Sequence, residues 1–297
     1  MRMSLAKWMA PVVMALLATS GGAAQPTPPA PQTSPAPARM LVICSPGSPG
    51  TTAQAQPTLD AFAAAAGKSA GWPSGTLGAI YFESADAGIA RLREPDAALA
   101  MVPLPFLIAH GSELSLAPRL SAVAQTGPSE VWSLVAKKGS VAAPASLDGW
   151  EVTGTPGYAA GFVRGAILSG WGPLPEGAKI TFTPRPLGAL RRAAAGEKVA
   201  VILDAAQTAA LASLPFAPEL EVIHTSRPLP GGYFCTVGDR LPAAEGAKVS
   251  AGLARLHETD GGKEILKTMR MTRFEPVDRE ALEEVRRLSS GTGSQAP

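Results

Sequence analysis

Cysteine and histidine, which supply disulfides and most metal ligands, are scarce in this sequence. Among 297 residues there are two cysteines, Cys44 and Cys235, and three histidines. Cysteines this far apart in the chain leave open whether they form a disulfide or stay as two buried thiols. The histidines, His110, His224 and His257, are scattered, and no pair of candidate ligands has the spacing of a metal site. We therefore expect neither a metal nor a cofactor.

An excess of charge of one sign is also missing. The 26 Lys and Arg residues nearly balance 24 Asp and Glu residues, and two of the basic ones, Arg2 and Lys7, lie in a segment that we expect to be removed. No Lys- or Arg-rich run provides the electrostatic footprint of a nucleic-acid binder. The sequence therefore argues against a nucleic-acid partner.

No catalytic motif is found in its proper context. The G-x-S-x-G pattern at 67–71 follows an alanine-rich predicted helix, whereas a nucleophile elbow requires a strand at that place. The Gly-Lys-Ser within it lacks the earlier glycine of a phosphate-binding P-loop, because Phe62 stands there. A serine–histidine–acid triad is not indicated, since each histidine is explained as a surface or structural residue. The sequence thus indicates a binding protein, not an enzyme.

What is present begins with an export signal and a tether. Residues 1–24 combine a positive start, an apolar stretch and a small-residue cleavage site, which is typical of a cleavable signal peptide. The apolar stretch is short for a membrane span and contains Pro11, although an uncleaved anchor is the alternative. Residues 25–38 contain six prolines and form a predicted extended linker. We expect a periplasmic protein whose folded part starts near Arg39.

The rest of the chain alternates strands and helices. Such alternation favours parallel β-α-β units. The clearest stretch, 149–204, contains predicted strands at 150–153, 179–183 and 199–203, with helices at 162–168 and 187–195. An earlier stretch repeats the rhythm, with predicted strands at 40–44, 77–82 and 97–102. Two similar units indicate an α/β fold with two lobes, each a mostly parallel sheet flanked by helices.

Two pairs of extended runs predict the joins between the lobes. One pair is interrupted at Gly127-Pro128 and the other at 227–232, and two such crossings would form a hinge. We therefore expect the first lobe to comprise residues 39–128 and 226–297. The second lobe would comprise residues 129–225.

Candidate binding residues follow the strands of the second lobe. Ligands of parallel sheets sit beyond the carboxyl ends of the strands and against helix N-termini, which favours the loop at 154–161. Arg185 and Asp204 each follow a predicted strand. Arg185 could hold an anion by a bidentate contact. Each of the two charges is equally explained as a solvated loop charge or as part of an ion pair.

The arrangement resembles the periplasmic solute-binding components of phosphate, phosphite and phosphonate ABC importers, which have the type II periplasmic binding protein fold. The resemblance covers most of residues 39–290. The resemblance depends on the order and spacing of six segments, 86–89, 95–106, 132–140, 146–150, 188–204 and 226–230. It implies hinge closure over a small phosphonate- or phosphate-like anion and docking, as a monomer, on an ABC permease of the inner membrane.

The resemblance also implies a set of ligand-binding residues. The hydroxyl run of the family falls on Tyr158 to Gly161, where only the phenol remains, although the backbone N–H groups of Ala160 and Gly161 could cradle an anion. The cleft histidine of the family falls on Arg185 and a cleft tyrosine on Asp86, whose carboxylate favours a ligand with a cationic group. The expected set is Ser45, Gly47, Ser48, Asp86, Tyr158, Ala160, Gly161, Arg185 and Asp204.

Two other classes of function stay open. A protein of the same fold could serve as a sensor or scaffold that presents its ligand-bound state to a membrane kinase, since the hydroxyl run is lost and the tether is long. An extracytoplasmic enzyme would need catalytic groups that converge in the cleft.

Overall fold

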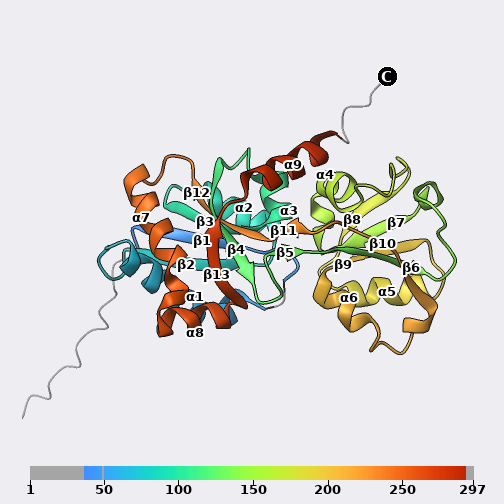
Figure 1. The fold of residues 1–297 in the computed structure, drawn as a ribbon, viewed down its shortest axis with the longest axis horizontal. Coiled ribbons are helices and arrows are strands. Elements are labelled where there is room, and N and C mark those ends of the chain that lie inside the picture. Colours follow the sequence, from blue (N-terminus) through green and yellow to red (C-terminus); the bar gives the residue numbers. More distant parts are fainter. Residues whose placement is uncertain (1–36, 49, 292–297) are drawn as a thin grey trace, which may run out of the picture. The chain divides into compact units, whose positions relative to one another are not determined.

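Two separate sheets organise the chain in the computed structural model, which describes residues 37–48 and 50–291 (Figure 1). Within these residues one sheet has six strands in the order β13-β4-β12-β3-β1-β2, and the other has five in the order β10-β6-β9-β7-β8. We call the parts built around them the first and the second lobe. The predicted signal peptide at 1–24 and nearly all of the predicted linker at 25–38 lie outside the described residues.

The first lobe combines a parallel centre with antiparallel additions. Strands β1, β2 and β3 are parallel. Beyond them β12 pairs antiparallel with β3, β4 pairs antiparallel with β12, and β13 pairs antiparallel with β4. The strands are β1 (Arg39–Cys44), β2 (Leu77–Phe82), β3 (Ala97–Pro103), β4 (Leu116–Ala124), β12 (Gly232–Val237) and β13 (Met271–Pro276). The helices are α1 (Thr52–Ser69), α2 (Ala85–Arg93), α3 (Leu104–His110), α7 (Ala243–Ala254), α8 (Asp260–Thr268) and α9 (Arg279–Ser290), with a 3₁₀ turn, η5, at Leu256–Glu258.

The second lobe follows the same plan. Strands β7, β8 and β9 are parallel. Beyond them β6 pairs antiparallel with β9, and β10 pairs antiparallel with β6. The strands are β6 (Ser133–Lys137), β7 (Glu151–Gly154), β8 (Lys179–Phe182), β9 (Val199–Leu203) and β10 (Leu220–Thr225). The helices are α4 (Ala160–Phe162), which runs on into the π-helix η3 (Val163–Ile167), α5 (Pro186–Ala194) and α6 (Ala205–Leu211); 3₁₀ turns are η1 (Pro144–Leu147), η2 (Thr155–Tyr158) and η4 (Ala217–Glu219).

The predicted α/β fold with two lobes is confirmed. Most strands of each sheet run in the direction of its β-α-β unit, and the strands that run the opposite way are β12 and β13 in the first lobe and β6 in the second. The parallel strands are the apolar ones: all five residues of β9 are buried, and so are Leu41 to Cys44 of β1. Strands covered by helices on both faces are expected to read as such continuous apolar runs.

The two predicted crossings lie side by side and are hydrogen-bonded to each other. The short strands β5 (Ser129–Glu130) and β11 (Leu229–Pro230) pair antiparallel. Beyond them the backbone N–H of Trp132 donates to Ser226 Oγ at 2.9 Å, and the N–H of Ser226 donates to the carbonyl of Trp132 at 2.8 Å. The two connections between the lobes thus form one paired ribbon.

Helix α9 adds a contact that the sequence does not reveal. It follows β13 of the first lobe but packs against α4 and η3 of the second. Two glycines allow this approach, since a Cβ at Gly161 or Gly165 would lie 3.0 Å or 2.0 Å from a backbone carbonyl oxygen of α9. Glu284 of α9 also forms an ion pair with Arg227, which lies in the second crossing.

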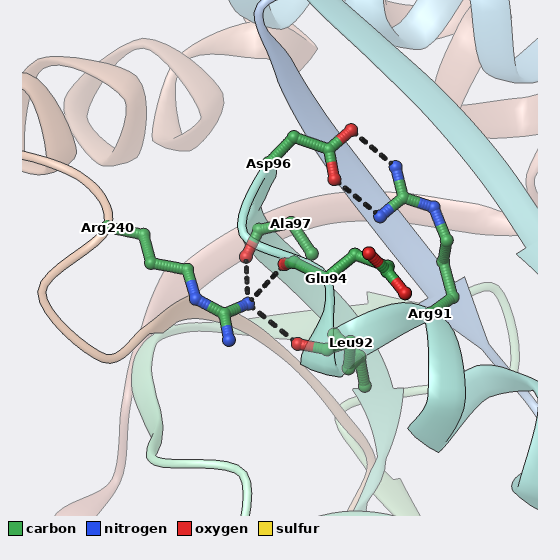
Figure 2. Close-up of polar contacts among 6 residues, drawn as sticks. All are labelled: Arg91, Leu92, Glu94, Asp96, Ala97 and Arg240. Atoms are coloured by element: carbon green, nitrogen blue, oxygen red, sulfur yellow. Dashed lines mark hydrogen bonds and ion pairs between the residues drawn. The ribbon is translucent and has the colours of Figure 1, made fainter.

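The C-terminal end of α2 is fixed by an arginine from a distant turn (Figure 2). Arg240, which follows β12, donates from Nη1 to the carbonyls of Leu92, Glu94 and Ala97 at 2.7, 2.8 and 3.0 Å. Next to it Arg91 and Asp96 form a bidentate pair, with both N–O distances at 2.7 Å. The Arg240 bonds occupy the carbonyls of Leu92 and Glu94 at the end of α2 and that of Ala97 at the start of β3, and they tie the helix end to the sheet.

Both cysteines are buried and unpaired in the described part of the chain. Burial raises the pKa of each thiol, Cys44 and Cys235, to about 12. The thiols therefore stay protonated at neutral pH and behave as small apolar groups.

Candidate functional site

A cavity of about 870 Å³ opens where loops of the two lobes face each other. Each loop follows the carboxyl end of a parallel strand, namely β1, β2, β7, β8 or β9. In open α/β sheets this is the edge at which ligands bind. The lining residues are Pro46, Gly47, Ser48, Gly50, Thr51, Gln54, Glu83, Ser84, Ala85, Asp86, Tyr158, Phe182, Pro184, Arg185 and Gln207.

The loop after β1 forms one wall because its backbone approaches the second lobe closely. Gly47 has φ +81°, and a Cβ there would lie 3.0 Å from the Thr155 side chain, so this position favours glycine. The hydroxyls of Ser45 and Ser48 share a hydrogen bond of 2.7 Å. The loop ends at Thr51, whose side chain caps α1 in a capping box with Gln54.

The start of α2 supplies two carboxylates to the same wall. Ser84 caps the helix by accepting from the N–H of Ala87 at 3.5 Å, and Asp86 lies in the first turn, where the helix dipole favours a negative charge. Glu83 immediately precedes the cap. The first lobe thus presents two exposed acidic groups to the cavity, Glu83 and Asp86.

The opposite wall combines two aromatic rings with one cation. The rings of Tyr158 and Phe182 meet edge to face with 5.9 Å between their centroids, and Phe182 is 41% exposed. Burial raises the pKa of the Tyr158 hydroxyl, so it stays protonated. Arg185 lies just before α5 and is exposed, and its guanidinium has no hydrogen bond or ion pair among the described residues. It is therefore free to bind an anion.

Asp204 has a structural task in addition to its position near the site. It caps α6, with Oδ1 accepting from the N–H of Gln207 at 2.7 Å, while Gln207 accepts in return from the N–H of Asp204 at 3.1 Å. Burial raises the pKa of Asp204, and the backbone hydrogen bonds from Gln207 and Ala206 oppose that shift. Nearby, Glu130 accepts from the N–H of Ala205 at 2.8 Å.

The structure brings five of the nine predicted site residues together around the first cavity: Gly47, Ser48, Asp86, Tyr158 and Arg185. Ser45 and Asp204 line a smaller adjoining cavity of about 150 Å³, which also contacts Tyr158. Ala160 and Gly161 line a third cavity, next to the end of α9. The predicted sharing of one ligand by Arg185 and the N–H groups of Ala160 and Gly161 therefore does not match this grouping.

The sequence reasoning missed three conspicuous lining residues. Glu83 and Phe182 each follow or end a strand, so their position at the sheet edge was a usable signal. Gln207 stands three residues after Asp204, which is the spacing of a capping box. Within residues 37–48 and 50–291 no group of His, Cys, Asp or Glu has the arrangement of a metal site. No helix in the same ranges is long and apolar enough to cross a membrane.

The fold and the site together define a class. Two α/β lobes, joined by a paired hinge and enclosing a solute-sized cavity at the carboxyl ends of their strands, are the architecture of type II periplasmic binding proteins. A family model described as the periplasmic substrate-binding protein of phosphonate ABC transporters matches residues 174–282. This match and the fold support the family that the sequence resemblance predicted.

Solved structures share the fold. XAC2383 from Xanthomonas citri bound to ATP is 14% identical, with a TM-score of 0.65, over 86% of this chain and 97% of that one. A binding-protein component of an ABC phosphonate transporter from Pseudomonas aeruginosa is 15% identical, with a TM-score of 0.61, over 86% and 87%. PhnD1 from Prochlorococcus marinus in complex with methylphosphonate is 14% identical, with a TM-score of 0.55, over 86% and 98%. A search of curated proteins finds no match.

These findings support a solute-binding role for an ABC importer, with a small-molecule ligand and a permease as partners. They do not favour the sensor or scaffold alternative. The family is one of binding proteins rather than enzymes, and it implies an extracytoplasmic location.

Proposed function

We propose that this chain captures a small solute in the 870 Å³ cavity and presents it to an ABC permease of the inner membrane. The observation that supports the proposal most strongly is that residues of both lobes line the cavity. Its residues come from the first lobe, through 46–54 and 83–86, and from the second, through Tyr158, Phe182 and Arg185. A ligand that contacts both walls binds the closed form more tightly than the open form and so favours closure.

The ligand that we propose is a phosphonate- or phosphate-like anion bound to Arg185. A guanidinium binds such an oxyanion in a bidentate manner, and Arg185 is the cation in the wall of this cavity. Ser48, Thr51 and Gln207 supply further polar groups. The description of the matching family, which names phosphonate, supports this choice.

The residues of the cavity wall support binding without a chemical step. The described lining of the first cavity includes neither histidine nor cysteine, so it offers no nucleophile paired with an imidazole base. We propose that the protein is not an enzyme. Closure needs no covalent chemistry, since a micromolar dissociation constant corresponds to only about −8 kcal/mol.

The remaining parts of the proposal concern the chain as a whole. Residues 1–24 would direct export and be removed, and residues 25–38 would tether the folded part. The first lobe would comprise 39–128 with 226–297, and the second 129–225. We further propose that the protein acts as a monomer in the periplasm and binds no nucleic acid, in keeping with its balanced charge.

Isothermal titration calorimetry with methylphosphonate, phosphite and phosphate tests this function. Replacing Arg185 by alanine should weaken binding about 10- to 100-fold, because a hydrogen bond to a charged group contributes about 1.5–3 kcal/mol. Arg191→Ala is the matched control, since Arg191 is an exposed arginine of α5, the helix that Arg185 precedes, and it lies outside the cavity. Equal loss in both variants would remove Arg185 from the site. Failure of all three anions to bind the unmodified protein would contradict the ligand.

A further inference from the structure

A second cavity of about 760 Å³ lies beside the proposed site. Its walls are the C-terminal part of α3 with the turn that follows, the start of α4 and the end of α9. Part of this wall is apolar and comprises Leu107, Ile108, Leu116, Ala159 and Phe162. Among the residues that the structure describes, its lining includes Arg286 but no carboxylate, unlike the first cavity with Glu83 and Asp86.

Tyr158 stands between the two cavities. Within the described ranges it is the one residue that lines both of them, and it lines the small cavity of Asp204 as well. The two compartments also lie within electrostatic reach of each other. His110 lines the second cavity, and burial lowers the pKa of its imidazole. The negative charges of Glu113 and Asp86 oppose that shift, and Asp86 lines the first cavity.

The position of the Tyr158 ring depends on packing rather than on a polar anchor. Its hydroxyl makes no hydrogen bond among the described residues, whereas its ring meets Phe182 edge to face at 5.9 Å. Its backbone belongs to the turn η2, which is held close to β8, since a Cβ at Gly157 would lie 1.9 Å from the carbonyl oxygen of Thr181. The turn thus fixes where the ring enters the space between the cavities.

We propose that the Tyr158 ring is the partition between these cavities and sets the longest ligand that the site accepts. The proposal rests on the proposed function, with the anionic end of the ligand at Arg185. With the ring in place, the tail of the ligand is confined to the first cavity. Without the ring, the tail extends past Ala159 and Phe162 into apolar surroundings. Phosphonates with an unbranched alkyl chain are the ligands with which this limit on length can be measured.

Calorimetric titration of 1-alkylphosphonates from methyl to octyl tests the partition. Each methylene that enters an apolar wall raises the affinity about fourfold. For the unmodified protein the affinity should stop rising once the chain reaches Tyr158. For Tyr158→Ala it should continue to rise, so that octylphosphonate binds at least tenfold more tightly than to the unmodified protein. Tyr158→Phe, which keeps the ring, should behave like the unmodified protein.

Further variants separate the partition from cavity size and from folding. Gln54→Ala enlarges the first cavity alone, because Gln54 does not line the second, and it should leave the limit on chain length in place. Tyr158→Leu serves if the alanine variant does not fold. The same chain-length dependence in Tyr158→Ala and in the unmodified protein would overturn the partition while the proposed function stands. If no alkylphosphonate binds to any of the proteins but phosphate or phosphite binds, the partition is overturned and the proposed function stands; if none of these anions binds, both are overturned.

Discussion

Gly165→Ala should destabilise the protein, although the same change usually stabilises a helix. Gly165 lies in η3, and a Cβ there would stand 2.0 Å from the carbonyl oxygen of Leu288 and 2.8 Å from Cα of Ser289. Both are backbone atoms of α9, so no side-chain rotation relieves the clash. To reach ordinary contact, α9 must move away by roughly 1.4 Å. That shift loosens the packing of α9 on α4 and η3 and disturbs the core cluster to which its buried Leu282 and Val285 belong.

Overpacking of this kind costs about 1–3 kcal/mol, and the helix preference of alanine over glycine returns about 1 kcal/mol. We expect a net loss of up to about 2 kcal/mol, or a fall in Tm of up to about 4 °C for a chain of this size. The matched control is Gly188→Ala in α5, where nothing lies within 4 Å of the added Cβ. That variant should gain about 0.4–1 kcal/mol.

Urea unfolding followed by tryptophan fluorescence measures both variants, with unchanged m values as the check that only stability has changed. Opposite signs for Gly165→Ala and Gly188→Ala are the expected result. If Gly165→Ala is as stable as the unmodified protein while Gly188→Ala is more stable, α9 does not pack on η3 as described.

The remaining predictions concern four side chains, Arg240, Asp204, Arg185 and Tyr158. Arg240→Ala should lower the free energy of unfolding by about 2 kcal/mol, because carbonyls at the end of α2 lose a charged donor, and Arg240→Lys should recover only part of it in the same urea assay. Asp204→Ala should cost about 1 kcal/mol through the lost cap of α6, whereas Asp204→Asn keeps the cap. Burial raises the pKa of Asp204 in the folded state, so protonation favours folding; the unmodified protein should gain stability relative to Asp204→Asn as the pH falls from 7 through that pKa, and a constant difference would contradict this. Arg185→Ala should weaken anion binding in calorimetry, and Tyr158→Ala should extend the accepted chain length, as set out above.

Much of the fold is predictable because its determinants are local. The apolar runs at 40–44, 97–102 and 199–203 are strands in the structure, and Ser84 and Asp204 cap helices. The alternation of strands and helices, which is also a local pattern, predicted the two lobes. The direction of the strands was harder to predict. Strand β12 pairs with β3 although about 130 residues separate them in the chain, and no local sequence pattern indicates such a pairing.

The lining of the first cavity was predictable mainly at the ends of strands. Arg185 was predicted because a strand end places the next residues at the edge of the sheet, whereas Asp86 was predicted from the family resemblance, and both line the first cavity. Ala160 and Gly161 were grouped with Arg185 because they follow β7 in the chain, but the turn η2 intervenes and carries them to the second cavity. The contact of α9 with Gly161 and Gly165 could not be read from either segment alone, because each glycine is needed only where another backbone comes close.

The mutual hydrogen bonds of Trp132 and Ser226 have a consequence for how motion would be observed. Because the two connections are bonded to each other, we expect them to bend together, so that opening and closing of the lobes would be a rotation about one axis. A single pair of fluorescent labels, one on each lobe, would then report the whole movement as one distance, with two states rather than a spread of orientations.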